Sequence, residues 1–128
     1  MEISEAWVWV GRVLSGLTIL FLLMDAVGKL ARPKPVVEST IKLGYPESTI
    51  LGMGVTILVS TLLYAIPPTA PFGAILITGY LGGAVASQVR VRSPWGSHIL
   101  FPIYVGAFAW VGLFLRDPRV QALLPGAN

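Results

Sequence analysis

Asp25 and Lys29 are the residues of this sequence whose types and spacing point most directly to chemistry. They lie four residues apart, in the acid-then-base order that pairs favourably on one face of a helix. The sequence around them is apolar enough to lie in lipid, where each charge costs about 2.5 to 3.5 kcal/mol at the bilayer centre. We therefore expect both side chains to face protein, as a structural ion pair or as part of a site. Alternatively, Lys29 extends to the headgroups and leaves Asp25 to a neighbouring helix.

His98 is the only histidine in the chain, and histidine is the side chain that most readily exchanges protons near neutral pH. With Asp25 and Lys29 it is a candidate catalytic residue, for proton transfer or as a single axial ligand. The alternative is a structural residue at a helix start. The chain has no cysteine and no cluster of His, Asp and Glu with metal-ligand spacing, so the sequence predicts no metal site and no thiol chemistry.

The stretch between Glu47 and Arg90 shows which solvent surrounds these residues. It contains no Asp, Glu, Lys, Arg or His, and only the proline-rich segment 66–71 interrupts it. The segments 48–66 and 72–89 are each long enough, at about 1.5 Å per residue, to cross the hydrocarbon of a bilayer. Neither has the polar face that a soluble helix needs. The sequence therefore predicts two membrane-spanning helices joined by a tight turn.

Two further spans are predicted, at 7–30 and 97–115, in a chain of 128 residues that is 55% hydrophobic and 12% charged. The acidic residues before the first span are atypical of a signal peptide, so we expect this span to be retained. Pro35 and Gly44 bracket a short amphipathic helix, which we expect to lie along the interface. The prediction is an all-α, single-domain, antiparallel four-helix bundle over residues 1–128, with this interfacial helix between its first two spans.

An antiparallel bundle would bring polar residues from several helices to the end that holds Asp25 and Lys29. Such a group at the mouth of an apolar bundle predicts a pocket for an apolar ligand. Its predicted binding residues are Asp25, Lys29, Tyr80, Gln88, Arg90 and His98, with Glu47 nearby. The loops after the first and third spans carry more Lys and Arg than the opposite side, so we expect both loops in the cytoplasm.

Three other features predict contacts within the bundle. Gly79 and Gly83 lie four residues apart, which predicts close helix packing, mainly inside the bundle and otherwise against a second copy or a partner membrane protein. Arg12 lies near the other membrane face, where it is expected to pair with Asp117 or to bind a lipid phosphate. Pro102 cannot donate a hydrogen bond to the carbonyl of His98, so a kink is expected there.

Several short motifs in this order resemble those of the DoxX-like family of small bacterial membrane proteins. They are GRVLSG at 11–16, MDAVGK at 24–29, LGYPE at 43–47, TGYLGGAVA at 78–86, HILFP at 98–102 and LRDPR at 115–119. The resemblance implies a four-helix protein of the bacterial inner membrane. The wider group is named after a subunit of an archaeal thiosulfate:quinone oxidoreductase, and relatives are linked to oxidative-stress complexes. Arg12, Asp25, Lys29, Tyr80, Arg90 and His98 match the family pattern.

Gln88 departs from that pattern, because many members have histidine there. Glutamine hydrogen-bonds but does not shuttle protons, which argues against a two-histidine site for haem or quinone. The sequence leaves the cofactor unknown, with quinone as a candidate ahead of haem. The first hypothesis is thus an oxidoreductase membrane subunit that binds a quinone or another apolar ligand. The alternative is a non-catalytic accessory or scaffold protein that binds lipid or stabilises partner membrane proteins, so the sequence leaves open whether the protein is an enzyme. Four short helices without repeats disfavour transport, and the net charge of +3 sets topology and lipid contact rather than nucleic-acid binding.

Overall fold

The computed structural model describes residues 3–124, and the elements formed in that part of the chain are helices. Four of its helical segments are long and apolar enough to cross a membrane, which confirms the predicted all-helical, four-span fold. The spans are α1 (Glu5–Ala31), α3 (Ile50–Ala65) with the preceding turn η1 (Glu47–Thr49), α4 (Ala70–Arg90) with η2 (Pro67–Thr69), and α5 (Phe101–Arg116) with the π-helical turn η3 (Trp95–Ile99). The shorter helices are α2 (Lys34–Lys42) and α6 (Pro118–Gln121).

The ends of the helices follow local signals in the sequence. The side chain of Ser4 caps α1 by accepting a hydrogen bond from the backbone nitrogen of Trp7 at 3.4 Å. Arg32 ends this helix in the left-handed conformation, with φ of 54°. Helix α2 forms between the first two spans as predicted, although it begins at Lys34, one residue before Pro35.

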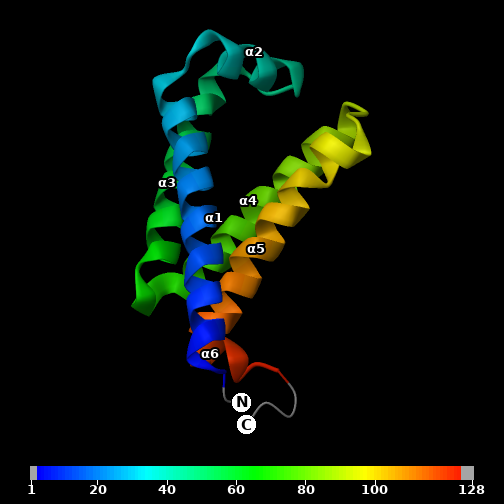
Figure 1. The fold of residues 1–128 in the computed structure, drawn as a ribbon. Coiled ribbons are helices and arrows are strands. Elements are labelled where there is room, and N and C mark those ends of the chain that lie inside the picture. Colours follow the sequence, from blue (N-terminus) through cyan, green and yellow to red (C-terminus); the bar gives the residue numbers. More distant parts are fainter. Residues whose placement is uncertain (1–2, 125–128) are drawn as a thin grey trace.

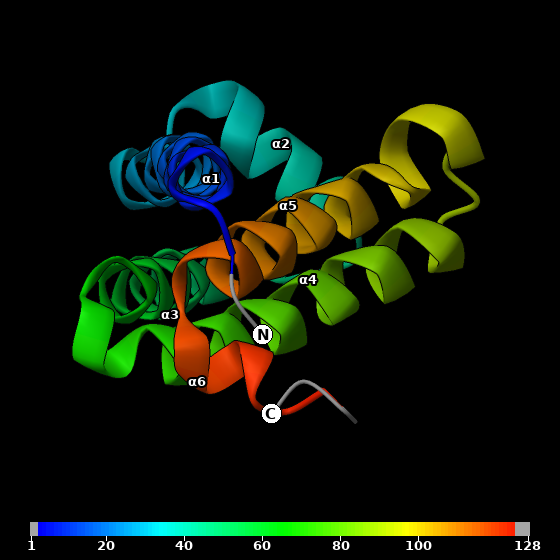
Figure 2. The ribbon, with the colours of Figure 1, turned by 60° about the horizontal axis from the view of Figure 1, so that its bottom comes forward.

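The four spans form a ring in which each helix packs against two neighbours. Helix α1 contacts α3 and α5, and α4 contacts the same two helices from the other side (Figure 2). Successive spans run in opposite directions (Figure 1). The loops after α1 and α4 therefore share one end, which we call the loop end, whereas α6 and the α3–α4 turn lie at the other, which we call the closed end. The arrangement brings the C-terminal part of α1 to the same end as that of α4.

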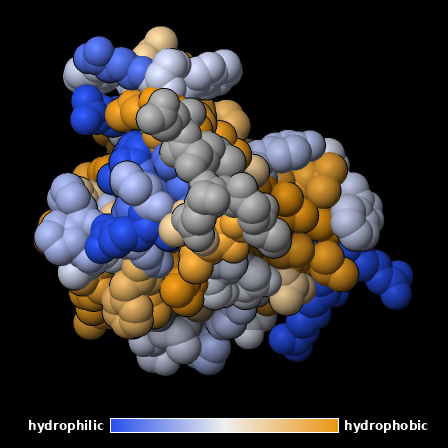
Figure 3. Space-filling view, turned by 90° about the horizontal axis from the view of Figure 1, so that it is seen from below, coloured by the Kyte–Doolittle hydropathy of each residue, from blue (hydrophilic) through white to orange (hydrophobic). Residues whose placement is uncertain are grey.

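Most residues in the apolar part of each span are not buried in the protein. Seen from the closed end, hydrophobic residues cover much of the flanks, and hydrophilic residues gather in patches (Figure 3). A soluble protein would bury such flanks, so these surfaces fit a lipid environment. The chain is a multi-pass membrane protein.

The helices come closest at the closed end. A Cβ atom at Gly112 on α5 would lie 2.6 Å from the hydroxyl oxygen of Ser15, and one at Gly11 would lie 2.7 Å from the Cβ of Leu115. A Cβ atom at Gly73 on α4 would overlap the backbone of Tyr64 on α3. Only glycine permits these approaches, which fix α1 against α5 and α3 against α4.

Toward the loop end, the α1–α3 pair and the α4–α5 pair diverge (Figure 1). The prediction that Gly79 and Gly83 pack mainly against a helix of the bundle is wrong, because a Cβ atom at either position would have no neighbour within 4 Å. Both residues lie on the part of α4 that has moved away from α1 and α3. The packing role falls instead to Gly11 and Ser15, which have the same spacing and face Gly112.

A buried network of hydrogen bonds also holds the closed end together. The fully buried Tyr64 donates to the carbonyl of Ala109 at 2.6 Å, and its hydroxyl lies 3.0 Å from that of Ser15. Arg116 donates from Nε to Ser15 at 2.8 Å and from Nη2 to the carbonyl of Tyr64 at 3.2 Å. The network joins α1, α3 and α5 at the closed end. The helix pairs can therefore separate only toward the loop end.

Asp117 and Arg119 form a second clamp at the closed end. Their side chains pair at 2.8 Å, and Arg119 also donates to the carbonyls of Pro67 and Pro68 at 2.7 and 3.1 Å. Arg12 lies instead over the ring of Trp9, 4.7 Å from its centroid. The predicted pair of Arg12 with Asp117 is therefore not formed. Arg119, which lies two residues from Asp117, pairs with its carboxylate instead. Binding of a lipid phosphate by Arg12 stays a prediction.

The contact between Asp117 and Arg119 predicts that the thermal stability of the protein falls at low pH. Hydrogen bonds from the Arg119 side chain lower the pKa of the Asp117 carboxyl. A carboxyl whose pKa is lower in the folded state stabilises the fold above its unfolded pKa, about 4, and loses that contribution as pH falls through its folded pKa. We expect Asp117→Asn to flatten the loss of thermal stability below about pH 4. Unfolding temperatures in detergent from pH 7 to pH 3 measure the effect, with Glu38→Gln on the exposed face of α2 as the control. Parallel curves for Asp117→Asn and the unmutated protein would contradict the prediction.

Candidate functional site

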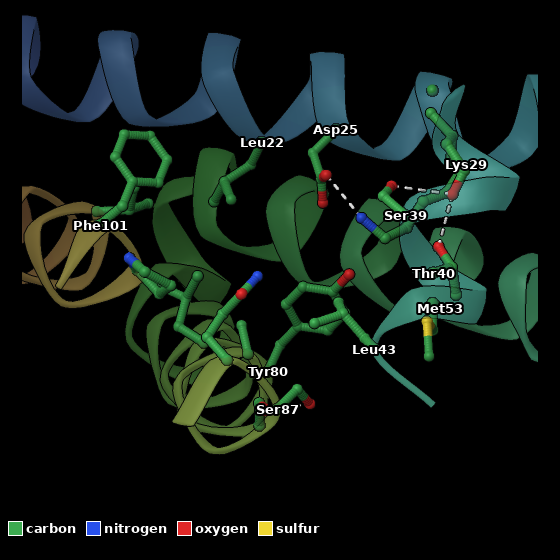
Figure 4. Close-up of a pocket in the computed structure, with 18 of the residues that line it drawn as sticks. Leu22, Asp25, Lys29, Ser39, Thr40, Leu43, Met53, Tyr80, Ser87 and Phe101 are labelled. Atoms are coloured by element: carbon green, nitrogen blue, oxygen red, sulfur yellow. Dashed lines mark hydrogen bonds and ion pairs between the residues drawn. The ribbon is translucent and has the colours of Figure 1, made fainter. Parts of the chain in front are cut away.

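The divergence of the two helix pairs creates a cavity of about 680 Å³ at the loop end. Residues from α1, α2, α3, α4 and α5 and from the loop after α2 contribute to its wall (Figure 4). The volume lies within the range of about 300 to 1,000 Å³ that is typical of small-molecule sites. Its polar lining residues are Asp25, Lys29, Ser39, Thr40, Tyr45, Tyr80, Ser87 and Gln88.

Asp25 and Lys29 carry the charges of this cavity. The Lys29 Nζ donates to Asp25 Oδ1 at 2.6 Å, which confirms the predicted pairing. The side chains keep 17% and 32% of their surface exposed for Lys29 and Asp25, respectively. The pair is thus held beside open cavity space rather than sealed in the core. In Figure 4 the Asp25 carboxylate points from α1 into this space, toward the Lys29 ammonium.

The position of Lys29 depends on its contact with α3. A Cβ atom at Gly54 would lie 3.1 Å from the Cβ of Lys29, so the two helices nearly touch at this point. This contact leaves the long lysine side chain one direction to follow, toward α4. There its Nζ lies 5.9 Å from the centroid of the Tyr80 ring, within the range of a cation–π contact.

Tyr45 and Ser87 line the cavity and contact each other at its loop end. The Tyr45 hydroxyl lies 2.5 Å from Ser87 Oγ, and Ser87 also donates to the carbonyl of Gly83 at 2.8 Å. Gly44, with φ of 95°, makes the turn that brings Tyr45 to α4. These bonds tie the loop after α2 to α4. Sequence reasoning missed Tyr45, although its place directly after a glycine that ends a helix was a signal for it.

Gln88 presents a hydrogen-bond donor to the cavity. Its Oε1 accepts from Ser93 Oγ at 2.5 Å, so the amide is oriented by the loop that follows α4. Within residues 3–124 its amide nitrogen has no hydrogen-bond partner. The residue lies in the wall of the cavity, which makes this nitrogen a candidate donor to a ligand.

The rest of the lining is apolar. Leu22 points into the cavity from α1 (Figure 4), and Phe21 contacts Phe101 of α5 edge-to-face, with ring centroids 5.2 Å apart. We call the side of the cavity that holds the Lys29–Asp25 pair the polar wall, although Leu43 and Met53 also lie there, and the side with Leu22 and Phe101 the apolar wall (Figure 4). This distribution suits a molecule with a polar head and a hydrocarbon body. Its apolar lining residues are Phe21, Leu22, Met24, Val36, Leu43, Met53, Leu81, Ala84, Phe101, Pro102 and Val105, together with Gly28, Gly79 and Gly83.

His98 and Arg90 do not line the cavity, so the predicted convergence of all six residues is wrong for these two. His98 is exposed on η3, and its Nδ1 lies 2.7 Å from the hydroxyl of Ser97. The helix bends at Leu100, two residues before Pro102, and η3 lies beyond the residues of α5 that line the cavity. Arg90 is exposed as well and lies near Gly44. In the part of the chain that the structure describes, no three His, Cys, Asp or Glu side chains gather closely enough to hold a metal ion.

The fold and this site define the class of protein: a small integral membrane protein whose four spans, with α2 and the loop after it, line an open cavity with a charged pair in its wall. The model of the DoxX-like family matches residues 13–112, so the chain belongs to the DoxX-like family. The match includes every residue that lines the cavity. No match was found among curated proteins or among solved structures.

Proposed function

We propose that the cavity binds a quinone, with its ring at the polar wall and its tail along the apolar wall, and that the protein acts as a membrane subunit of an oxidoreductase. The observation that carries this proposal is the Lys29–Asp25 pair beside Tyr80 in an otherwise apolar cavity. This site would lie within the bacterial inner membrane, where quinones dissolve.

The polar wall suits a quinone because the two carbonyl oxygens of the ring only accept hydrogen bonds. Lys29 has three N–H donors, of which Asp25 takes one. The Gln88 amide nitrogen is a second donor. Haem fits less well, because His98 lies outside the cavity and glutamine occupies position 88.

Reduction of a quinone to a quinol takes up two electrons and two protons. Tyr80 and Lys29 both carry protons and lie in the wall against which the ring would rest, so they are the candidate proton donors. Asp25 holds the Lys29 ammonium in place. A proton that passes from Lys29 to the ring would leave a neutral amine beside the Asp25 carboxylate, and a proton from water would then restore the pair. The electrons come, in this proposal, from a redox partner protein.

One observation supports the second candidate function, an accessory protein without a reaction of its own. Gly82 on α4 has open space above it and lies outside the cavity, next to Gly83 at its edge. A helix of a partner membrane protein can approach such a surface closely. This function predicts partner association that does not depend on a bound small molecule.

A filled cavity tests the first function. Ala84 is half-buried and lines the cavity, so Ala84→Phe places a ring in it. Gly82→Phe is the matched control, because Gly82 lies on the same helix, does not line the cavity and has no neighbour within 4 Å. We expect native mass spectrometry to show decylubiquinone bound to the unmutated protein and to Gly82→Phe, with at least about tenfold weaker binding to Ala84→Phe, equivalent to about 1.4 kcal/mol.

Two results would contradict the quinone proposal. The first is equal binding by Ala84→Phe and Gly82→Phe, which would place the ligand outside the cavity. The second is no binding by the unmutated protein. If, in addition, a partner membrane protein co-purifies with the unmutated chain and is lost in Gly82→Phe, the accessory function is favoured.

A further inference from the structure

We propose that the ligand enters the cavity sideways from the bilayer, between α1 and α5, and that its hydrocarbon tail remains in this opening. The opening is bordered by Phe21, Met24 and Phe101, and we call it the lateral portal. The inference rests on the proposed binding of a quinone, which it extends by naming the route and the part of the ligand that this route selects.

The first support is the way in which α1 and α5 separate. At the closed end the two helices touch through Gly11, Ser15 and Gly112. Toward the loop end they move apart (Figure 1), and their contact there is made by the long side chains of Phe21 and Phe101. At this level α1 and α5 contact each other through two aromatic rings rather than through their backbones. Such rings change rotamer rapidly, so this contact can open.

The second support is that the border residues belong to two surfaces at once. Phe21, Met24 and Phe101 line the cavity and keep 39%, 65% and 44% of their surface exposed. All three lie in membrane-spanning segments, where an exposed side chain faces lipid. This double placement is what an opening from the cavity to the bilayer requires.

The third support is that direct contacts join the elements around the cavity at three other places. The gap between α1 and α3 is closed where Gly54 meets Lys29. Helices α4 and α5 are joined by a hydrogen bond of 2.6 Å from Trp110 to Thr78. At the loop end, the bond between Tyr45 and Ser87 ties the loop after α2 to α4.

The portal also sets the orientation of the ligand. A ring that rests against Lys29 and Tyr80 leaves its tail on the apolar side, toward Phe21 and Phe101. A tail that passes between these rings stays in contact with lipid. The site therefore favours tailed molecules over water-soluble rings of the same chemistry.

The chain has no cysteine, so the portal can be closed by a cross-link at two introduced cysteines. We would treat Phe21→Cys/Phe101→Cys with a short, cleavable bis-methanethiosulfonate reagent. Native mass spectrometry then measures binding of decylubiquinone, which has a tail, and of ubiquinone-0, which has the ring alone. We expect the cross-link to weaken decylubiquinone binding at least tenfold, to leave ubiquinone-0 binding within about twofold, and to be reversed by a reducing agent.

A second double variant tests the side of the cavity between α3 and α4. Met53→Cys/Gly79→Cys places the same cross-link between α3 and α4. The portal proposal is overturned if decylubiquinone still binds after the α1–α5 cross-link, or if the α3–α4 cross-link alone abolishes its binding. Failure of the proposed function has a different signature, because the unmodified protein would then bind neither quinone.

Discussion

Gly73→Ala is expected to destabilise the protein by about 3 kcal/mol, at the upper end of the usual cost of overpacking. The added methyl group would overlap the backbone of Tyr64, and a backbone cannot move aside as a flexible side chain does. Relief would require α3 and α4 to separate at the closed end, where Tyr64 is also tied to α1 and α5. Unfolding in mixed micelles by titration with a denaturing detergent measures the loss.

Gly79→Ala is the matched control for this prediction. It makes the same chemical change on the same helix, but the new methyl group meets no atom within 4 Å. Alanine is a better helix former than glycine, so we expect unchanged stability or a gain of up to about 1 kcal/mol. Equal losses for the two variants would show that the closed end is not packed as described.

The second large effect is expected at the ion pair. Asp25→Asn or Lys29→Met alone leaves one charge in the cavity without its partner. Breaking a fully buried pair costs about 3 to 5 kcal/mol, but exposure of these side chains reduces the expected loss to roughly 2 kcal/mol. The double variant Asp25→Asn/Lys29→Met removes both charges and should recover most of the stability. The same detergent titration measures all three variants.

Ligand binding separates the two roles that this pair can have. If the pair only holds the bundle together, the double variant regains both stability and decylubiquinone binding. If the pair belongs to a quinone site, as we propose, the double variant regains stability but stays at least tenfold weaker in binding. Recovery of both properties would contradict a direct role for Lys29 in holding the ring.

Several features of this protein follow from the sequence alone. The four spans follow from the length of the apolar segments, because lipid leaves no other way to satisfy the backbone. The α3–α4 turn follows from three prolines within residues 66–71, and α2 from an amphipathic pattern between Pro35 and Gly44. The pair of Asp25 with Lys29 is local too, since both lie one turn apart on one helix.

Only the tertiary structure decided which glycines pack and which face open space. Spacing identifies Gly79 and Gly83 as candidates for a helix contact, but the contact depends on where two helices cross. Here the crossing lies at the closed end, at Gly11, Gly73 and Gly112, and the helices separate before they reach the other two. The pattern of small residues does not encode the angle between helices, so the sequence did not predict the cavity wall on α4.

The same reason explains the differences at the candidate site. The sequence placed Tyr80, Gln88 and His98 at one end, which their positions in antiparallel helices determine. Whether a side chain at that end enters the cavity depends on the divergence of the helix pairs and on the break before Pro102, which puts His98 on the outer surface. Sequence thus determined the spans, their order and the charged pair, because these depend on local chemistry. Tertiary structure decided the cavity and its lining, because these depend on the angles at which distant segments meet.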